Sequence, residues 1–289
     1  MSIRVRMKKQ SRLRVLAGRF YYWLKRQYDW RLSGKRFARR REARLLPVVQ
    51  IRHQTPLYRN LPRLEMWLQE NKVTNLRRAV PRVNRVVLRP GEVFSFWRLV
   101  GKPTRRRGYV EGMVLNHGRI VPGIGGGLCQ LTNLIYWMTL HTPLTVIERW
   151  RHSYDVFPDS GRTQPFGSGA TCAFPSLDLQ IKNNTDQTFQ LHLEITPTQL
   201  RGEWRCERDC GLRYEVYEDF HQITQAYTGQ YLRRNSLRRR VFHGDRLVRD
   251  EFITENCALM MYEPFLTGST AAPADGESKE THGSNQGGS

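Results

Sequence analysis

The feature that most constrains the fold is a run of glycines that leads directly into an apolar helix pattern. Residues 123–127 read Gly-Ile-Gly-Gly-Gly. Beyond them, apolar side chains recur at spacings of three and four, at Leu131, Leu134, Ile135 and Met138. Pro143 cannot continue a helix, and residues 144–150 alternate like a strand. A tight turn, a helix over 128–140 and a returning strand favour an α+β fold, with a central helix packed on a mainly antiparallel sheet.

Most other patterns in the chain indicate short strands. Pro90-Gly91 marks a turn between two β-prone runs in residues 84–96, and Asn116-His117-Gly118 marks the turn of a hairpin over 109–121. Residues 177–182 alternate as a strand, with 189–195 as the expected hairpin partner. The sequence also predicts β-prone runs over 212–218, 239–242 and 246–254, and helical structure over 57–80.

Charge and composition divide the chain into three predicted parts. The formal net charge is +21, and in the first 45 residues only Asp29 and Glu42 oppose a dense set of arginines and lysines. We expect a basic helical arm over 1–45, helical from residue 3, then an α+β domain over 46–266 and a disordered tail over 267–289. The apolar stripe of the arm consists of Val15, Leu16, Phe20, Trp23 and Leu24. Such a helix suits an anionic membrane surface, and a solvated helix packed on the domain is the alternative.

The sequence carries no recognisable targeting segment. Arg14 and Arg19 interrupt the apolar run over 13–24, and no run of about 20 apolar residues could span a bilayer. We therefore expect a cytoplasmic protein that can lie on the inner face of the membrane. The five cysteines are odd in number and follow no secretion signal, which argues against a disulfide scaffold.

Cys129 falls in the first turn of the expected central helix. The positive end of the helix dipole and the unpaired amides stabilise a thiolate at that position. Amides near Gly127 and Gln130 could serve as an oxyanion hole, with the Gln130 side chain as a further donor. The features also have a structural explanation, since glycines before a helix often mark close packing and a cysteine there is often an inert apolar residue.

His152 follows the strand after the helix and is the expected general base for Cys129. The order of cysteine, helix, strand and histidine is similar to that of papain-like and transglutaminase-like enzymes. If residues 146–152 are extended, Glu148 lies on the same face as His152. The third member of a triad stays open: the candidates are Asp155, Asp159 and Asp178, of which Asp178 is preferred, and a dyad without an acid is the alternative.

Several motifs together resemble the VanW family. They are Arg89-Pro90-Gly91-Glu92-Val93-Phe94-Ser95-Phe96, Gly125-Gly126-Gly127-Leu128-Cys129-Gln130-Leu131-Thr132, Glu148-Arg149 with His152-Ser153, Asp178-Leu179-Gln180-Ile181-Lys182-Asn183-Asn184, and residues 254–266. The family takes its name from vancomycin resistance, so the resemblance implies a cell-wall or glycopeptide context and no particular reaction. Many members carry Asp-Ala-Thr where this chain has Gly169-Ala170-Thr171, which removes one candidate acid.

Two functions are consistent with these residues. In the first, a thiol hydrolase or transferase acts on a peptide-like cell-wall precursor, with Cys129, His152 and Asp178 as catalytic residues. In the second, the chain is a non-catalytic module that binds an anionic cell-wall precursor at the membrane surface. The expected ligand-binding residues are Gly125, Gly126, Gly127, Gln130, Glu148, Arg149 and Ser153.

Two other classes of site receive less support. Cys206-x3-Cys210, with His221 and Cys257, contains ligand types that suit zinc, but the spacing is loose, and we expect neither a metal nor another cofactor. Nucleic acid is not the expected partner, because the chain lacks the motifs of nucleic-acid-binding domains. The basic runs that leave this alternative open are Arg233-Arg234, Arg238-Arg239-Arg240 and the N-terminal arm.

Overall fold

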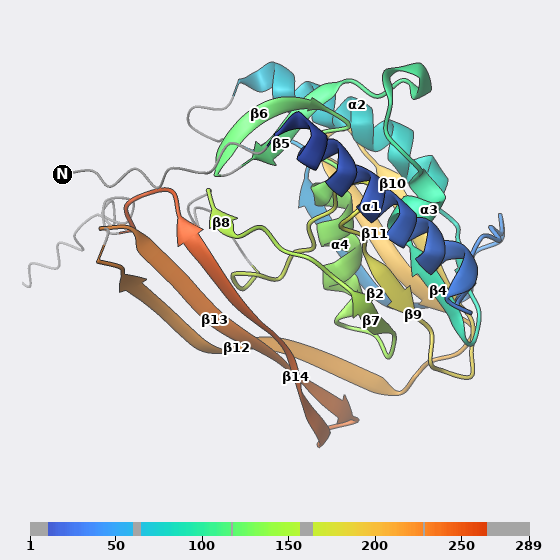
Figure 1. The fold of residues 1–289 in the computed structure, drawn as a ribbon. Coiled ribbons are helices and arrows are strands. Elements are labelled where there is room, and N and C mark those ends of the chain that lie inside the picture. Colours follow the sequence, from blue (N-terminus) through green and yellow to red (C-terminus); the bar gives the residue numbers. More distant parts are fainter. Residues whose placement is uncertain (1–10, 60–64, 117, 157–163, 228, 265–289) are drawn as a thin grey trace, which may run out of the picture.

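The computed structural model of the protein (Figure 1) describes residues 11–59, 65–116, 118–156, 164–227 and 229–264. The helices are α1 (Arg12–Leu32), α2 (Met66–Val83), α3 (Phe96–Val100) and α4 (Cys129–Thr139), with a 3-10 turn, η1, at Arg105–Arg107. Helices and antiparallel sheets share one chain, so the expected α+β class is confirmed. The expected tail over 267–289 lies outside the described residues.

The expected central helix is confirmed as α4, which packs on a fully antiparallel sheet. This sheet has the order β2 (Val48–Pro56), β11 (Gln199–Cys206), β10 (Phe189–Ile195) and β3 (Val87–Leu88). Trp204 of β11 is fully buried beneath α4 and donates from Nε1 to Thr139 Oγ1 at 3.0 Å. Gly202 leaves room for Met138, because a Cβ at residue 202 would lie 2.7 Å from the Met138 methyl carbon. The apolar spacing of the helix therefore matches its burial.

A second sheet corrects one predicted pairing. Its order is β1 (Arg36–Phe37), β4 (Glu92–Ser95), β9 (Gln180–Lys182) and β7 (Thr145–Glu148). The expected hairpin between 177–182 and 189–195 is wrong, because β9 pairs with β4 and β7 whereas β10 pairs with β11 and β3. The reason is the link between them: Asn183 donates to the carbonyl oxygens of Leu88 and Gln187 and directs β10 into the first sheet.

Two helices are shorter than the sequence patterns predict. Within the described part of the arm expected over 3–45, α1 ends at Leu32 and β1 follows it. Gly34 has a φ of 73°, which is the left-handed backbone that ends a helix. Helical structure was expected over 57–80, but residues 57–59 are not helical, residues 60–64 lie outside the described residues, and α2 runs from Met66 to Val83.

Two hairpin-like units complete the fold. The expected hairpin is confirmed as β5 (Glu111–Asn116) and β6 (Arg119–Ile124). The three β-prone runs after residue 211 belong to longer strands, β12 (Leu212–Gln225), β13 (Tyr231–His243) and β14 (Arg246–Met260). These strands form an antiparallel ribbon beside the body of the molecule (Figure 1), and β8 (Tyr154–Asp155) adds to β14 in parallel. Among the described helices, none combines the length and the apolarity needed to cross a bilayer.

Candidate functional site

The glycine turn, residues 125–127, connects β6 to α4 through close backbone approaches. A Cβ at Gly126 would lie 2.3 Å from the carbonyl of Gly112 on β5. Gly127 has a φ of 88°, and a Cβ there would lie 2.2 Å from Cγ of Lys72. Since real Cβ atoms do not approach other atoms this closely, both positions require glycine. The turn is thereby fixed against β5 and α2 immediately before Cys129.

Helix α4 begins without a side-chain cap. Its N-cap residue, Leu128, makes no capping hydrogen bond, and the amides of Gly127, Leu128 and Cys129 donate to no acceptor within the described ranges. Free amides at a helix N-terminus attract negative charge. The donors that we expected to stabilise an anion are therefore present, and they are backbone amides and not side chains.

Gln130 contributes differently from the expectation. Its backbone amide donates to Gly127 O at 3.1 Å, and its side-chain amide donates to Thr55 Oγ1 and Pro56 O at 3.0 and 2.9 Å. These donors hold α4 against β2, so they are already engaged and are not available to an oxyanion.

Cys129 lies within hydrogen-bond reach of His152 and Cys172. Cys172 donates to Cys129 Sγ from its thiol at 3.8 Å and from its amide at 3.5 Å. The Cys172 thiol and then the His152 ring lower the pKa of Cys129 well below its ordinary value, against the opposing effect of burial. Burial and the neighbouring Cys129 raise the pKa of Cys172. Cys129 is therefore the thiolate of the pair, and Cys172 is its proton-bearing neighbour.

His152 reaches Cys129 from a loop and not from the strand itself. Strand β7 ends at Glu148, and Trp150 then forms a bridge with Thr171, whose amide donates to Trp150 O at 2.8 Å. This bridge holds the histidine segment beside the segment that carries Cys172. The neighbouring Ser153 has an exposed side chain, and its carbonyl accepts from the Leu259 amide, so it secures the loop to β14.

The candidate acid Asp178 belongs to a buried ionic network. Oδ1 accepts from the amides of Trp97 and Leu179, Oδ2 accepts from Ser95 Oγ at 2.5 Å, and Arg26 lies 3.8 Å away. Glu148 forms a bidentate pair with the same guanidinium of Arg26, at 2.7 and 2.5 Å. Both carboxylates thus hold α1 on the domain, and neither is hydrogen-bonded to His152 in the described part of the chain.

The other candidate acids do not complete a triad either. Asp155 accepts from Arg233 at 3.4 Å and from Tyr262 at 3.0 Å, and Asp159 lies outside the described residues. At Gly169 a Cβ would lie 2.7 Å from Asn133 Oδ1, so the Asn133 side chain occupies the space that a larger residue would need. Within the described residues the arrangement is a Cys-His pair assisted by Cys172.

The guanidinium of Arg149 makes hydrogen bonds that connect three segments of the fold. Its guanidinium donates to Gly167 O, to Gly169 O at 2.9 Å and to Asn256 Oδ1 at 3.2 Å, and it lies over the ring of Tyr136 at 5.0 Å. It ties the 167–169 segment to β14 and α4. The guanidinium of Arg149 is therefore engaged within the fold, and Arg149 is not among the residues that line the cavity described below.

The site opens into a cavity of about 700 Å³, called the site cavity below. It is lined by the glycine turn, Cys129, His152, the β5–β6 hairpin and the segments 151–156 and 164–174. Two ionisable residues of the cavity, Lys72 and Cys172, were not among the expected site residues. Lys72 had no local signal because four strands, the short helix α3 and the turn η1 separate α2 from α4 along the chain. A volume of this size holds a small organic or peptide ligand.

The residues of the other two sequence alternatives, a zinc site and a nucleic-acid-binding surface, make other interactions in the structure. Cys206 and Cys210 are free thiols whose side chains are hydrogen-bonded to one another, and His221 accepts a hydrogen bond from Arg233 at 3.0 Å. No group of three metal-ligating side chains converges among the residues described. The arginines of β13 interact with residues of the same sheet. The ion pairs are Arg233 with Asp155, Arg234 with Glu255, Arg238 with Asp250 and Arg239 with Glu251, and Arg240 lies over the ring of Tyr217.

Comparison with known proteins identifies the family. A sequence profile described as VanW like protein matches residues 71–205. The chain is 32% identical over 201 residues to the vancomycin B-type resistance protein VanW of Enterococcus faecalis, which covers 70% of this chain and 73% of that protein. It is 27% identical over 113 residues to the uncharacterized protein YoaR of Bacillus subtilis, covering 39% and 36% of the two chains. No solved structure matches the chain significantly. The profile and the extended match to VanW overlap the glycine turn, Cys129 and His152, and this chain belongs to the VanW family.

Proposed function

We propose that this VanW-family protein is a cysteine-dependent hydrolase or acyltransferase that acts on a peptide-like cell-wall precursor. The observation that carries the proposal is the Cys129 thiol at the wall of the site cavity, with His152 in hydrogen-bond reach and a pKa lowered well below the ordinary value. A thiolate with an adjacent base and free amides at a helix N-terminus is the combination that acyl transfer requires.

The proposed reaction uses these groups in two steps. The Cys129 thiolate attacks the carbonyl carbon of the substrate, and the oxyanion that forms accepts hydrogen bonds from the free amides of Leu128 and Cys129. Protonated His152 donates its proton to the leaving amine as the C–N bond breaks, which leaves a thioester on Cys129. His152 then takes a proton from water or an acceptor amine, whose attack on the thioester releases the product and the thiolate.

The substrate class rests on the family. One relative is named for vancomycin B-type resistance, and vancomycin is a glycopeptide that acts on the cell wall, which supports a cell-wall substrate. We propose the same association for this chain, with a cell-wall precursor as the partner and the cytoplasmic face of the membrane as the location. Neither nucleic acid nor a cofactor is part of the proposal.

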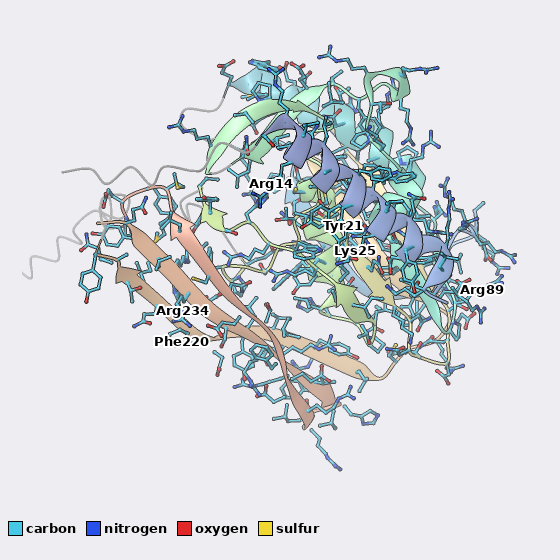
Figure 2. All side chains as sticks on the ribbon, in the orientation of Figure 1. Arg14, Tyr21, Lys25, Arg89, Phe220 and Arg234 are labelled. Atoms are coloured by element: carbon cyan, nitrogen blue, oxygen red, sulfur yellow. The ribbon has the colours of Figure 1, made fainter. Side chains whose placement is uncertain are left out.

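Helix α1 is the proposed membrane contact. Its side chains from Arg12 to Lys25 are exposed, apart from Gly18, and the exposed aromatic residues include Phe20, at 60% exposure, and Trp23. Figure 2 shows Arg14, Tyr21 and Lys25 along this helix. Aromatic rings beside arginines and lysines fit the interface of an anionic bilayer.

The experiment replaces Cys129 in the chromosome of the host bacterium. We expect Cys129→Ala to change glycopeptide susceptibility as much as deletion of the whole protein does, and His152→Ala to change it in the same direction. Cys257→Ser is the matched control, because Cys257 is an exposed thiol on β14, and it should behave as wild type. A Cys129→Ala strain indistinguishable from wild type, in a host whose deletion strain differs, would reject catalysis.

That last result would favour the second candidate, a non-catalytic module that binds an anionic precursor. The specific observation behind it is the set of free amides at the start of α4, which attract an anion without any chemistry at Cys129. The two candidates therefore share one cavity and differ in whether the thiol is required.

A further inference from the structure

Lys72 is a buried lysine that faces the site cavity without a partner. It lies on α2, its residue is only 4% exposed, and it lines the cavity together with the glycine turn. No carboxylate or other acceptor in the described ranges is hydrogen-bonded or ion-paired to it. A buried ammonium group without a counter-charge is costly, so its presence needs an explanation.

The stem of Lys72 passes closely along the glycine turn that leads to the proposed nucleophile. A Cβ at Gly127 would lie 2.2 Å from Lys72 Cγ and 2.7 Å from its Cβ, which shows how closely the stem passes the glycine turn. Cys129 follows two residues later, at the first position of α4. Packing against the turn would be provided equally by an uncharged methionine, so packing alone does not account for the ammonium group.

The rest of the cavity is also cationic. Its other basic residues are Arg59, Lys102 and Arg151, which come from three separate segments of the chain. The single acidic residue among the described lining residues is Asp155, and it is already paired with Arg233 and hydrogen-bonded by Tyr262. The free amides of the glycine turn add partial positive charge. The described lining residues therefore carry more positive than negative charge, which favours a negatively charged ligand.

We propose that Lys72 binds an oxyanion of the substrate, the carboxylate of a peptide-like ligand, and positions the neighbouring carbonyl group at Cys129. This inference rests on the proposed function for the identity of the substrate, but the binding step does not depend on catalysis. A phosphate offers the same oxyanion chemistry, and the experiment separates it from a carboxylate.

The charge state of Lys72 limits the pH range over which the site binds an oxyanion. Burial, and then the charge of Arg59, lower the pKa of Lys72 to about 8. The ammonium form therefore predominates at neutral pH and is lost above pH 8, and the affinity for an oxyanion falls with it. The comparison with a Lys72 variant isolates the contribution of this residue from those of the other ionisable or charged groups that line the cavity, which are Arg59, Lys102, Cys129, Arg151, His152, Tyr154, Asp155 and Cys172.

The experiment measures binding of three probes by calorimetry in the Cys129→Ser background, where no covalent step can occur. The probes are N-acetyl-glycyl-glycine, its C-terminal amide and inorganic phosphate. We expect the free carboxylate to bind at least tenfold more tightly than the amide at pH 7, since a hydrogen bond to a charged group contributes about one to two orders of magnitude in affinity. Phosphate binding tighter than the peptide carboxylate would overturn the carboxylate assignment.

Lys72→Met is the decisive variant, and Lys102→Met, which removes an exposed lysine of the same cavity, is its control. We expect Lys72→Met to weaken carboxylate binding about tenfold or more at pH 7 and to abolish the loss of affinity above pH 8, with Lys102→Met close to the parent. Unchanged affinity in Lys72→Met would overturn the inference.

Protein stability separates this role from a structural one. Removing an unpaired buried charge should leave the melting temperature of the ligand-free protein unchanged or raise it, whereas a lysine that holds the fold together should lower it on replacement. If Lys72→Met does not fold, the same pH break is sought in the parent protein, and affinity that stays constant from pH 7 to 9.5 rejects the inference. Lys72-dependent binding together with an unreactive Cys129 would retain this inference and reject the proposed catalysis.

Discussion

The hydrogen bond of Cys172 lowers the pKa of the proposed nucleophile more than that of His152 does. The two sulfur atoms lie 3.8 Å apart, and the pKa of Cys129 is lowered first by the Cys172 thiol and then by the histidine. The sequence identified Cys129 and His152 from their order around the helix and the strand. It gave no reason to link Cys172, because the 43-residue separation is closed by tertiary contacts alone, namely the Trp150–Thr171 bridge and the hydrogen bonds of Thr132 and Asn133 with Ala170.

Asp178 was expected as an orienting or structural carboxylate. The structure places it against Arg26 and Ser95, which agrees with the structural alternative. Burial raises its pKa to about 6, with opposing contributions from Ser95 and Arg26. An unfolded aspartate titrates near 4, so between pH 4 and 6 the folded chain holds this proton more tightly than the unfolded chain does.

The free energy of unfolding contributed by Asp178 should therefore fall as the pH rises from 4 through 6. Asp178→Asn cannot titrate, and we expect the stability of the wild type relative to this variant to decrease by about 2–3 kcal/mol across that interval. Urea unfolding at a series of pH values measures the difference. Asp186→Asn, at an exposed turn, is the control and should show no comparable slope. A relative stability of the wild type that rises with pH would contradict the account, and would mean that the pair with Arg26 outweighs burial.

At the scale of elements, α1 combines an anchored end with an exposed one. Arg26 is 7% exposed and donates to Glu148 and to the carbonyls of Pro175 and Ser176, which fixes the second half of the helix on the domain. The first half remains exposed. The sequence predicted a basic helix with an aromatic stripe, but the anchor depends on carboxylates more than 100 residues away and has no local signal.

The exposed half of α1 should bind anionic membranes. We expect the double variant Phe20→Ser with Trp23→Ser to lose at least tenfold of its binding to vesicles that contain anionic phosphatidylglycerol, because burying two aromatic rings at the interface contributes more than 1.4 kcal/mol. Vesicle co-sedimentation measures the effect. The control is Phe220→Ser, which removes an exposed ring from β12.

Equal binding of the Phe20 and Trp23 variant and the wild type would contradict the membrane proposal. Vesicles of neutral lipid alone should bind neither protein strongly, since the arginines and lysines of α1 require negative charge on the surface. A helix that only packs on the domain predicts no vesicle binding in any of these proteins.

At the scale of the whole molecule, local sequence patterns predicted the helices and strands more completely than they predicted which strands pair and which residues meet in the cavity. The apolar spacing fixed α4, and Asn116 to Gly118 fixed the β5–β6 hairpin. The pairing of β9 with β4 and β7 was missed, because a short buried strand carries no mark of which neighbour it joins. The same limit applies to the cavity. Its glycine turn was visible in the sequence, whereas Lys72 enters from α2 only through tertiary packing.

The most direct test of the account is the rate at which iodoacetamide modifies Cys129 as a function of pH, followed by peptide mass spectrometry. We predict that Cys129 reacts faster than free glutathione at pH 6.5, because its thiolate persists where an ordinary thiol loses about tenfold in reactivity for each pH unit below its pKa. His152→Ala should slow this reaction, and Cys257 in the same sample provides the exposed reference. A Cys129 that reacts no faster than glutathione at pH 6.5, with or without His152, would contradict the assignment of this cysteine as the activated nucleophile.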